Sequence, residues 1–333
     1  MSQSLDEWLA LTPETPLAPD LPLCDPHHHL FDDPTGRRPL YLLDELRRDA
    51  EGLNLVRTVF VDCMSHYLTE GPDAFRPVGE TVFVRRVAEQ SARTPGCHIA
   101  GIVGYVDMTL GDGAQAVLEA HMEAGGARFK GIRHATGWDP TPEIRSYRNQ
   151  PGGMLLDATF RQGVACVARL GLSFDAQVHH HQLVEVASLA RAFPEMPIIV
   201  NHTGVPLGIG PYAGKRDEVF RHWRGGIAEL AGCPNVFLKL GGVGMSTFGF
   251  GWTDRPTPPG SEEIAQATAP YFRACIELLG ADRCMFESNY PVDRRACSYV
   301  VLWNAFVRVT QDLAPDEIAN LFHDTAARAY RLD

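Results

Sequence analysis

Short apolar segments rich in β-branched residues recur along the whole chain, and a stretch with helical periodicity follows each of them. This alternation predicts repeated strand–helix units, because strands and amphipathic helices have different hydrophobic periods. Strands are expected at residues 21–28, 54–61, 98–105, 128–134, 172–179, 197–202, 235–241 and 283–288. Helices are expected at 78–91, 114–124, 154–170, 182–193, 217–231, 262–279, 299–310 and 315–330.

Eight alternating strands and helices can close into a barrel or form an open, doubly wound sheet. An open sheet should carry a Gly-rich phosphate-binding turn after an early strand, and this chain has none there. We therefore predict an α/β protein with a single-domain (β/α)8 TIM barrel over residues 21–333, which includes C-terminal helices and follows an N-terminal extension at 1–20. Functional groups in such a barrel lie at the C-terminal ends of the strands.

Composition narrows the classes of protein and of partner. The net charge of −11 would repel a phosphate backbone, so nucleic acid is not an expected partner. No basic leader and no apolar run long enough to span a bilayer is found, and the eight cysteines form no C-x-x-C pair. We expect a cytoplasmic protein that acts on a small molecule and does not bind a membrane; a homo-oligomer is compatible with this interpretation.

Three histidines and an aspartate stand at the end of the first predicted strand. Because strand side chains alternate between two faces, Asp25, His27 and His29 share one face and His28 points to the other. Two imidazoles at i and i+2 can both reach one metal ion or one water molecule. This pattern favours a functional site over a turn that merely carries polar residues.

Two further strand ends carry histidines. The sixth strand ends at His202, followed by a Gly-containing turn, at the same depth as His27 and His29. The fifth strand runs into three consecutive histidines, residues 179–181, and periodicity leaves open which of them points inward because the strand is ending there.

Four segments together resemble the amidohydrolase-2 branch of the amidohydrolase superfamily. They are the D-x-H-x-H run that begins at Asp25, the NHTG turn at 201–204, the NVFLKLGG run at 235–242 and the RCMFESNYPVD run at 283–293. This branch includes 2-pyrone-4,6-dicarboxylate lactonase, sugar-acid lactonases and metal-dependent aromatic decarboxylases. The similarity extends from about residue 22 to the end, with the motifs in the family's order at the expected strand ends.

The resemblance implies a barrel in which His27, His29 and His202 surround the reacting water. It also implies that these three residues are candidate ligands of a divalent metal, Zn or Mn, whose presence the sequence does not establish. In metal-using members a histidine of the fifth-strand loop also contributes, and His180 is the candidate here.

The eighth strand departs from the family pattern. Where related enzymes carry an aspartate that acts as general base, this chain has Asn289, and an amide cannot take a proton from water at neutral pH. Glu287 lies two residues earlier on the same face, where the family carries glycine. Two interpretations follow: Glu287 replaces the missing base, or it forms a buried ion pair with Lys239 on the neighbouring strand.

The fourth strand and nearby loops supply candidate substrate-binding residues. Arg133 can hold a carboxylate or carbonyl group with two hydrogen bonds, or it can pair with a barrel acid such as Asp175. His134, Trp138 and Tyr212 are further candidates, and weaker ones include Arg37 and Arg38.

These features lead to one functional hypothesis and two alternatives. We expect a hydrolase, a lactonase in the first instance, that attacks the carbonyl of a lactone or related cyclic ester or amide with water at the barrel mouth. The first alternative is a metal-dependent decarboxylase of an aromatic acid. The second is a barrel that binds a small molecule and has lost catalysis, which Asn289 suggests.

Overall fold

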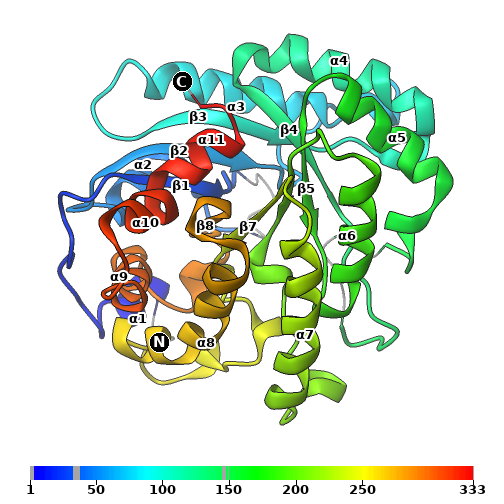
Figure 1. Ribbon diagram of the computed structural model, residues 1–333. Helices are drawn as coiled ribbons and strands as arrows, with labels where there is room; N and C mark the ends of the chain where they lie inside the picture. Colours follow the sequence, from blue (N-terminus) through cyan, green and yellow to red (C-terminus); the bar gives the residue numbers. More distant parts are fainter. Residues whose placement is uncertain (1–3, 33–37, 145–147, 149, 333) are drawn as a thin grey trace.

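Eight parallel strands form one sheet in the order β1 to β8, and helices surround it (Figure 1). The computed structural model describes residues 4–32, 38–144, 148 and 150–332. The strands are β1 (Leu23–His28), β2 (Leu55–Val61), β3 (His98–Gly104), β4 (Phe129–Ala135), β5 (Ser173–Gln177), β6 (Ile198–Val200), β7 (Val236–Leu240) and β8 (Cys284–Phe286). The predicted single-domain (β/α)8 barrel is confirmed.

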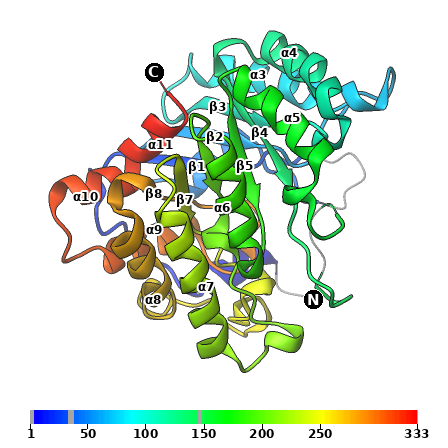
Figure 2. The ribbon, with the colours of Figure 1, turned by 45° about the vertical axis from the view of Figure 1, so that its right-hand side comes forward.

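The helices lie outside the strands, as a second view shows (Figure 2). They are α1 (Leu5–Leu9), α2 (Leu43–Asp49), α3 (Val78–Ser91), α4 (Ala114–Gly125), α5 (Ala158–Arg169), α6 (Leu183–Ala192), α7 (Arg216–Ala231), α8 (Ser261–Leu279), α9 (Tyr299–Val309), α10 (Pro315–Ala319) and α11 (Thr325–Ala329). A π-helical turn, Asn320–Asp324, joins the last two.

The structure differs from the sequence-based expectation at the ends of strands and at two short helices. Strands β5, β6 and β8 stop two residues before the predicted ends, because the chain turns sharply there; His202 and Asn289 both have positive φ angles, 54° and 56°. The helices α1 and α2 were not predicted. Each has at most seven residues, too few to display a helical period.

The barrel closes between β8 and β1 through the residues that follow β8. The Asn289 amide donates to the His27 carbonyl at 2.9 Å, and the His29 amide donates to the Tyr290 carbonyl at 2.7 Å. The Ser288 hydroxyl and amide both donate to the Asp25 carboxylate. The C-terminal end of β1 and the residues that follow β8 are therefore hydrogen-bonded directly to each other.

The other end of the barrel is sealed by the C-terminus of the chain. Inward side chains of the strands, such as Val59, Val103 and Met285, pack in one buried cluster with Ala326 of α11 and with Tyr330, which directly follows that helix. The Tyr330 hydroxyl donates to the Asp175 carboxylate inside the barrel at 2.7 Å. Access to the barrel interior is thus from the C-terminal ends of the strands.

The N-terminal segment lies against the barrel. The Trp8 indole donates to the Arg255 carbonyl at 2.9 Å, Glu14 accepts from the Ser261 amide at 2.7 Å, and the Leu17 amide donates to Asn304 at 2.8 Å. The division between an extension and a barrel at residue 20 stays a prediction. Within the described part of the chain, no helix combines the length and apolar character needed to cross a membrane.

Candidate active site

A cavity of about 680 Å³ opens at the C-terminal ends of the strands. Its polar lining comes from the ends of five strands and from the loop after β5: His29, Arg133, Gln177, His179, His202 and Asn289. The outer wall is built from α1, α2 and the turn after β8, including Leu5, Asp6, Asp49 and Arg294. The site therefore has a histidine-rich floor and a wall of mixed charge.

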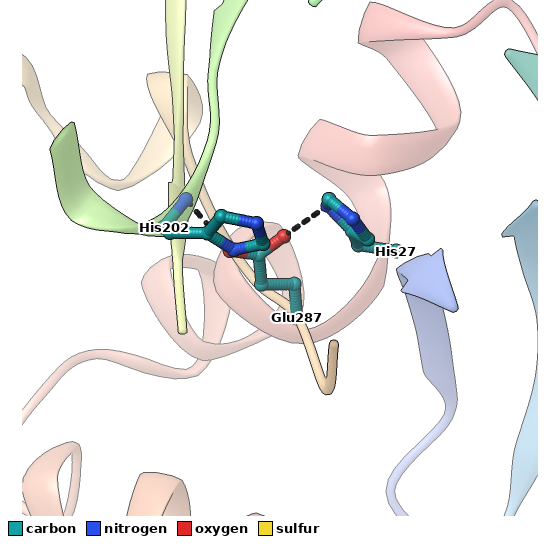
Figure 3. A group of neighbouring side chains, drawn as sticks. All are labelled: His27, His202 and Glu287. Atoms are coloured by element: carbon teal, nitrogen blue, oxygen red, sulfur yellow. Dashed lines mark hydrogen bonds and ion pairs between the residues drawn. The ribbon is translucent and has the colours of Figure 1, made fainter. Parts of the chain in front are cut away.

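Glu287 joins two of the predicted histidines beneath the floor of this cavity (Figure 3). One carboxylate oxygen, Oε1, accepts from Nδ1 and from the backbone amide of His202, each at 2.8 Å. The other, Oε2, lies 2.7 Å from Nδ1 of His27. The His27 ring lies 4.6 Å from that of His202 and 5.0 Å from that of His29, centroid to centroid. The structure thus brings the three histidines together, and two of them, His27 and His202, contact a buried carboxylate.

Two glycines after β7 make room for this arrangement. A Cβ at residue 241 would lie 2.4 Å from Cγ of Glu287, and a Cβ at residue 242 would lie 2.5 Å from Nδ1 of His202. Gly242 also has a φ angle of +67°, which favours glycine. The Gly241-Gly242 pair in the NVFLKLGG run is therefore required by the close approach of Glu287 and His202.

Three imidazoles that line the cavity have their Nδ1 atoms engaged by acceptors. Nδ1 of His29 lies 2.8 Å from the Val61 carbonyl, Nδ1 of His179 lies 3.2 Å from the Trp138 carbonyl, and Nδ1 of His202 faces Glu287. We assign the proton of each neutral ring to Nδ1, which leaves Nε2 as an acceptor. Burial lowers the pKa of His29 well below its usual value and that of His179 to about 4, so both rings are neutral at pH 7.

Lys239 pairs with Asp175 and not with Glu287, which corrects one of the two interpretations of Glu287. Nζ of Lys239 donates to Oδ2 of Asp175 at 2.8 Å, and Asn201 and Tyr330 also donate to this carboxylate. In the β7–β8 ladder Lys239 is level with Met285, two residues before Glu287. The long lysine side chain therefore reaches an acid deeper in the barrel, and Glu287 lies in the layer above.

Arg133 also pairs with an acid other than the one considered from sequence. Its Nε donates to Asp62 at 2.8 Å, and the second oxygen of Asp62 accepts from Arg148 at 2.7 Å. Asp62 follows β2, the strand next but one to β4, so it faces Arg133 at the barrel mouth, whereas Asp175 is taken by Lys239. Nη1 of Arg133 also lies 3.3 Å from Nε2 of His27, so the guanidinium belongs to the floor of the cavity.

Asn289 lines the cavity with its amide held in place by Asp293. Nδ2 of Asn289 donates to Oδ1 of Asp293 at 2.8 Å, and the Gly244 amide donates to Oδ2 at 2.8 Å. Burial raises the pKa of Asp293 to about 8. Because the NH2 group is used in this way, the amide oxygen of Asn289 is the atom available as a hydrogen-bond acceptor.

Six predicted site residues lie outside the lining formed by the described residues: His27 and Glu287, which lie beneath the floor, and His134, His180, Trp138 and Tyr212. His134 points out of the barrel, where Nδ1 accepts from the Met108 amide, and His180 accepts from the Leu207 amide. The Trp138 carbonyl accepts from His179 and His181, and the Tyr212 hydroxyl donates to Asp139 at 2.8 Å. Trp138 thus connects the loop after β4 to the loop after β5, and Tyr212 connects the loop after β4 to the loop after β6. Of the weaker candidates, Arg38 lines the cavity and Arg37 is outside the described residues.

Sequence reasoning did not single out several residues that the structure places in or against the cavity. His179 lines it in place of His180, and strand alternation from Asp175 and Gln177 was the available signal. Gln177 itself was on that face. Asp62 and Arg148 lie 86 residues apart in sequence, and no local pattern links them.

His27, His202 and Glu287 form a donor set suited to a divalent metal ion. Each offers one ligand atom, and these atoms all lie within 4.8 Å of one another. Two imidazole nitrogens and one carboxylate oxygen are ligands that Zn²⁺ commonly takes in catalytic sites. The set differs from the predicted one, because Glu287 takes the place of His29.

Comparisons with known proteins agree with this geometry. The model of a family described as amidohydrolase matches residues 24–332. The chain belongs to the amidohydrolase family. It is therefore an enzyme of the hydrolase type, as predicted.

Three proteins that are similar to this amidohydrolase illustrate the match. An uncharacterized protein of Sinorhizobium fredii, y4mH, is 35% identical over 94% of this chain and 99% of its own length. The L-fucono-1,5-lactonase of Burkholderia ambifaria is 28% identical over 75% of this chain and 76% of its own length. A crystal structure of an amidohydrolase from Burkholderia multivorans with bound Zn has a TM-score of 0.71 and 24% identity, covering 93% of this chain and 99% of that one. This last similarity shows the shared fold.

Proposed function

We propose that this amidohydrolase opens the ring of a polyhydroxylated lactone, the internal ester of a sugar acid. The observation that carries the proposal is the buried Glu287–His202 pair, which presents one imidazole nitrogen to a cavity that also contains Arg133. The names of the lactonase relatives support the substrate class. The imidazoles of His29 and His179, which are neutral at pH 7 and can accept from hydroxyl groups, support it as well.

His202 acts as the general base in this proposal, and Glu287 positions it. Nε2 of His202 takes a proton from water while the water oxygen forms a bond to the lactone carbonyl carbon. The Glu287 carboxylate at Nδ1 holds the tautomer and stabilises the imidazolium that forms. The imidazolium then returns its proton to the ring oxygen as the carbon–oxygen bond breaks, and the product is a hydroxy acid.

Arg133 and Asn289 complete the reaction site. The Arg133 guanidinium, held by Asp62, faces the oxygen on which negative charge develops during attack. The amide oxygen of Asn289 accepts a hydrogen bond from the attacking water and orients it, a role that needs no proton transfer. Asn289 can therefore occupy the position of the family's aspartate in an active enzyme.

A divalent ion held by His27, His202 and Glu287 would polarise the carbonyl or lower the pKa of a bound water. Chelator treatment followed by addition of Zn²⁺ or Mn²⁺ tests whether the enzyme uses it. Loss and recovery of activity would assign this chemistry to the ion. Full activity of metal-free protein would leave the Glu287–His202 pair as the source of the base.

The proposed function is tested by assaying purified protein against a panel of aldono-1,4- and aldono-1,5-lactones, with proton release and product analysis as readouts. The expected product is the ring-opened acid. Release of CO2 from aromatic acids, with no lactone turnover, would favour the decarboxylase alternative. Raised melting temperature with lactones but no product would favour a binding protein that has lost catalysis.

A further inference from the structure

Gln177 is a polar side chain in the cavity whose amide oxygen is not used by the fold. It is the last residue of β5, and it lines the cavity between the strand that carries Arg133 and the strand that leads to His202. Its amide oxygen, Oε1, is buried and has no hydrogen-bond partner among the described residues. A buried amide oxygen without a partner costs free energy, so a ligand that donates to it would be favoured.

Gln182, in the turn that follows β5, is an example of an amide that is fully used by the fold. Oε1 of Gln182 accepts from the amides of Trp138 and His179, at 2.9 and 3.2 Å, and its Nε2 donates to the Thr136 carbonyl at 3.0 Å. Gln182 therefore ties the loops after β4 and β5 together. Gln177, five residues earlier, has none of these contacts.

The surroundings of Gln177 define the chemistry of the group that it would bind. Its neighbour in the lining, His179, has Nδ1 engaged by the Trp138 carbonyl, so Nε2 is an acceptor. Gly137 follows β4 and leaves the space beside this nitrogen open, since a Cβ there would lie 3.2 Å from Nε2. A group that meets both residues must donate to an imidazole nitrogen or to an amide oxygen, and it can accept from the amide NH2. A hydroxyl group does both.

We infer that Gln177 is a specificity-determining residue that binds a free hydroxyl on the lactone ring, with His179 as the second acceptor. Because Gln177 and His202 follow adjacent strands, β5 and β6, a ring whose carbonyl lies at His202 presents a neighbouring substituent to Gln177. The inference rests on the proposed function. It adds that a lactone lacking ring hydroxyls leaves the amide unpaired and reacts more slowly.

The test compares a hydroxylated lactone with a matched lactone without ring hydroxyls, D-glucono-1,5-lactone and δ-valerolactone, or the most active aldonolactone of the panel and its deoxy analogue. In Gln177→Met, which has a similar volume and no amide, the ratio of kcat/KM for the two lactones should fall about tenfold, the usual effect of one neutral hydrogen bond and its buried partner. The loss should fall on the hydroxylated lactone. The melting temperature should not fall, because the variant removes an amide oxygen that has no partner in the free protein.

Two control variants separate substrate recognition from structure. Gln182→Met should lower the melting temperature, which Gln177→Met should not, because the Gln182 amide connects the loops after β4 and β5. Gln115→Met, on α4 and away from the cavity, should change neither the melting temperature nor the kcat/KM ratio, since among the described residues that amide hydrogen-bonds to Glu119 and Arg169.

An unchanged ratio in Gln177→Met would overturn the inference and leave the lactonase function standing. A lower melting temperature of Gln177→Met would also overturn it, because it would show that the amide has a structural partner. Absence of lactone turnover in the unmodified enzyme would instead remove the proposed function itself.

Discussion

In the proposed mechanism the most important residue is Glu287, at a position where the resemblance to the family implies glycine. Its carboxylate contacts two imidazoles and is fully buried, and the described lining of the cavity does not include it. A direct role as base was one interpretation of the sequence. The geometry favours a positioning role instead, since both oxygens already face histidines.

Glu287→Gln should lower kcat by about 10² to 10⁴-fold with a small change in KM. The neutral amide keeps the shape of the carboxylate, but it no longer stabilises a protonated His202. Steady-state kinetics with the preferred lactone, together with a melting curve, check this. Asn289→Asp serves as the comparison and should leave most of the activity, because the base is elsewhere. Near-normal kcat in folded Glu287→Gln would contradict the positioning role.

The two arginines that share Asp62 allow cavity chemistry to be separated from stability. Arg133→Ala and Arg148→Ala each leave the buried Asp62 carboxylate with one cation fewer, so each should lower the free energy of unfolding by roughly 3 kcal/mol. Arg133 lines the cavity, and Arg148 is not in the described lining. We expect kcat/KM to fall far more in Arg133→Ala, measured below the unfolding transition. Equal losses of kcat/KM would mark Arg133 as structural.

At the scale of elements, α1 of the N-terminal segment forms part of the wall of the cavity. Ser4 caps this helix, Leu5 and Asp6 line the cavity, and Asp6 pairs with Arg294, which also binds Asp49 of α2. Arg294 directly follows Asp293, the residue that holds Asn289. The helix is therefore fastened to the same turn that carries part of the reaction site.

Leu5→Trp should narrow the outer cavity and raise KM for lactones with long side chains, while kcat for small lactones stays near its original value. The physical reason is added side-chain volume at the wall and unchanged chemistry at the floor. Leu11→Trp is the matched control, because Leu11 is 49% exposed and follows α1 outside the lining. An equal effect of both substitutions on KM would argue against a wall formed by α1.

At the scale of the whole molecule, buried ionisable groups predict a stability maximum near neutral pH. Burial lowers the pKa of five histidines to about 3 or 4, and their stabilising effect is lost as the pH falls from about 6.5 toward those values. These residues are His28, His121, His134, His179 and His180. Burial raises the pKa of Glu80 and Asp293 to about 8, so their effect is lost as the pH rises toward 8.

Urea denaturation between about pH 4.5 and 8 should therefore show stability falling on both sides of neutrality. His28→Leu gives a sharper check, because His28 faces away from the cavity and neither ring nitrogen has a hydrogen-bond partner among the described residues. Its removal should reduce the acid-side slope by about 1.4 kcal/mol per pH unit, without loss of stability at pH 7. An unchanged slope would show that His28 is protonated in the folded protein.

The alternation of periods along the chain was sufficient to predict the barrel and the strand ends at which His27, His29 and His202 stand. Hydrophobic periodicity is a local property that predicts the strands. Because the C-terminal ends of parallel strands lie at one end of the barrel, the residues at those ends can then be predicted to lie near one another. Alternation along β5 favours His179 as the inward histidine but does not decide it, because the strand ends there. The helices α1 and α2 could not be predicted, because helices this short lack a full hydrophobic period.

The tertiary structure alone decided which charged groups pair. From sequence the pairs considered were Lys239 with Glu287 and Arg133 with Asp175. In the barrel Lys239 pairs with Asp175, Arg133 pairs with Asp62, and Glu287 contacts the histidines. Pairing depends on the stagger of neighbouring strands and on the reach of each side chain, which no spacing along the chain specifies. The sequence thus determined which charged groups lie inside the barrel. The packing of the barrel's layers determined which of these groups pair with each other and which face the cavity.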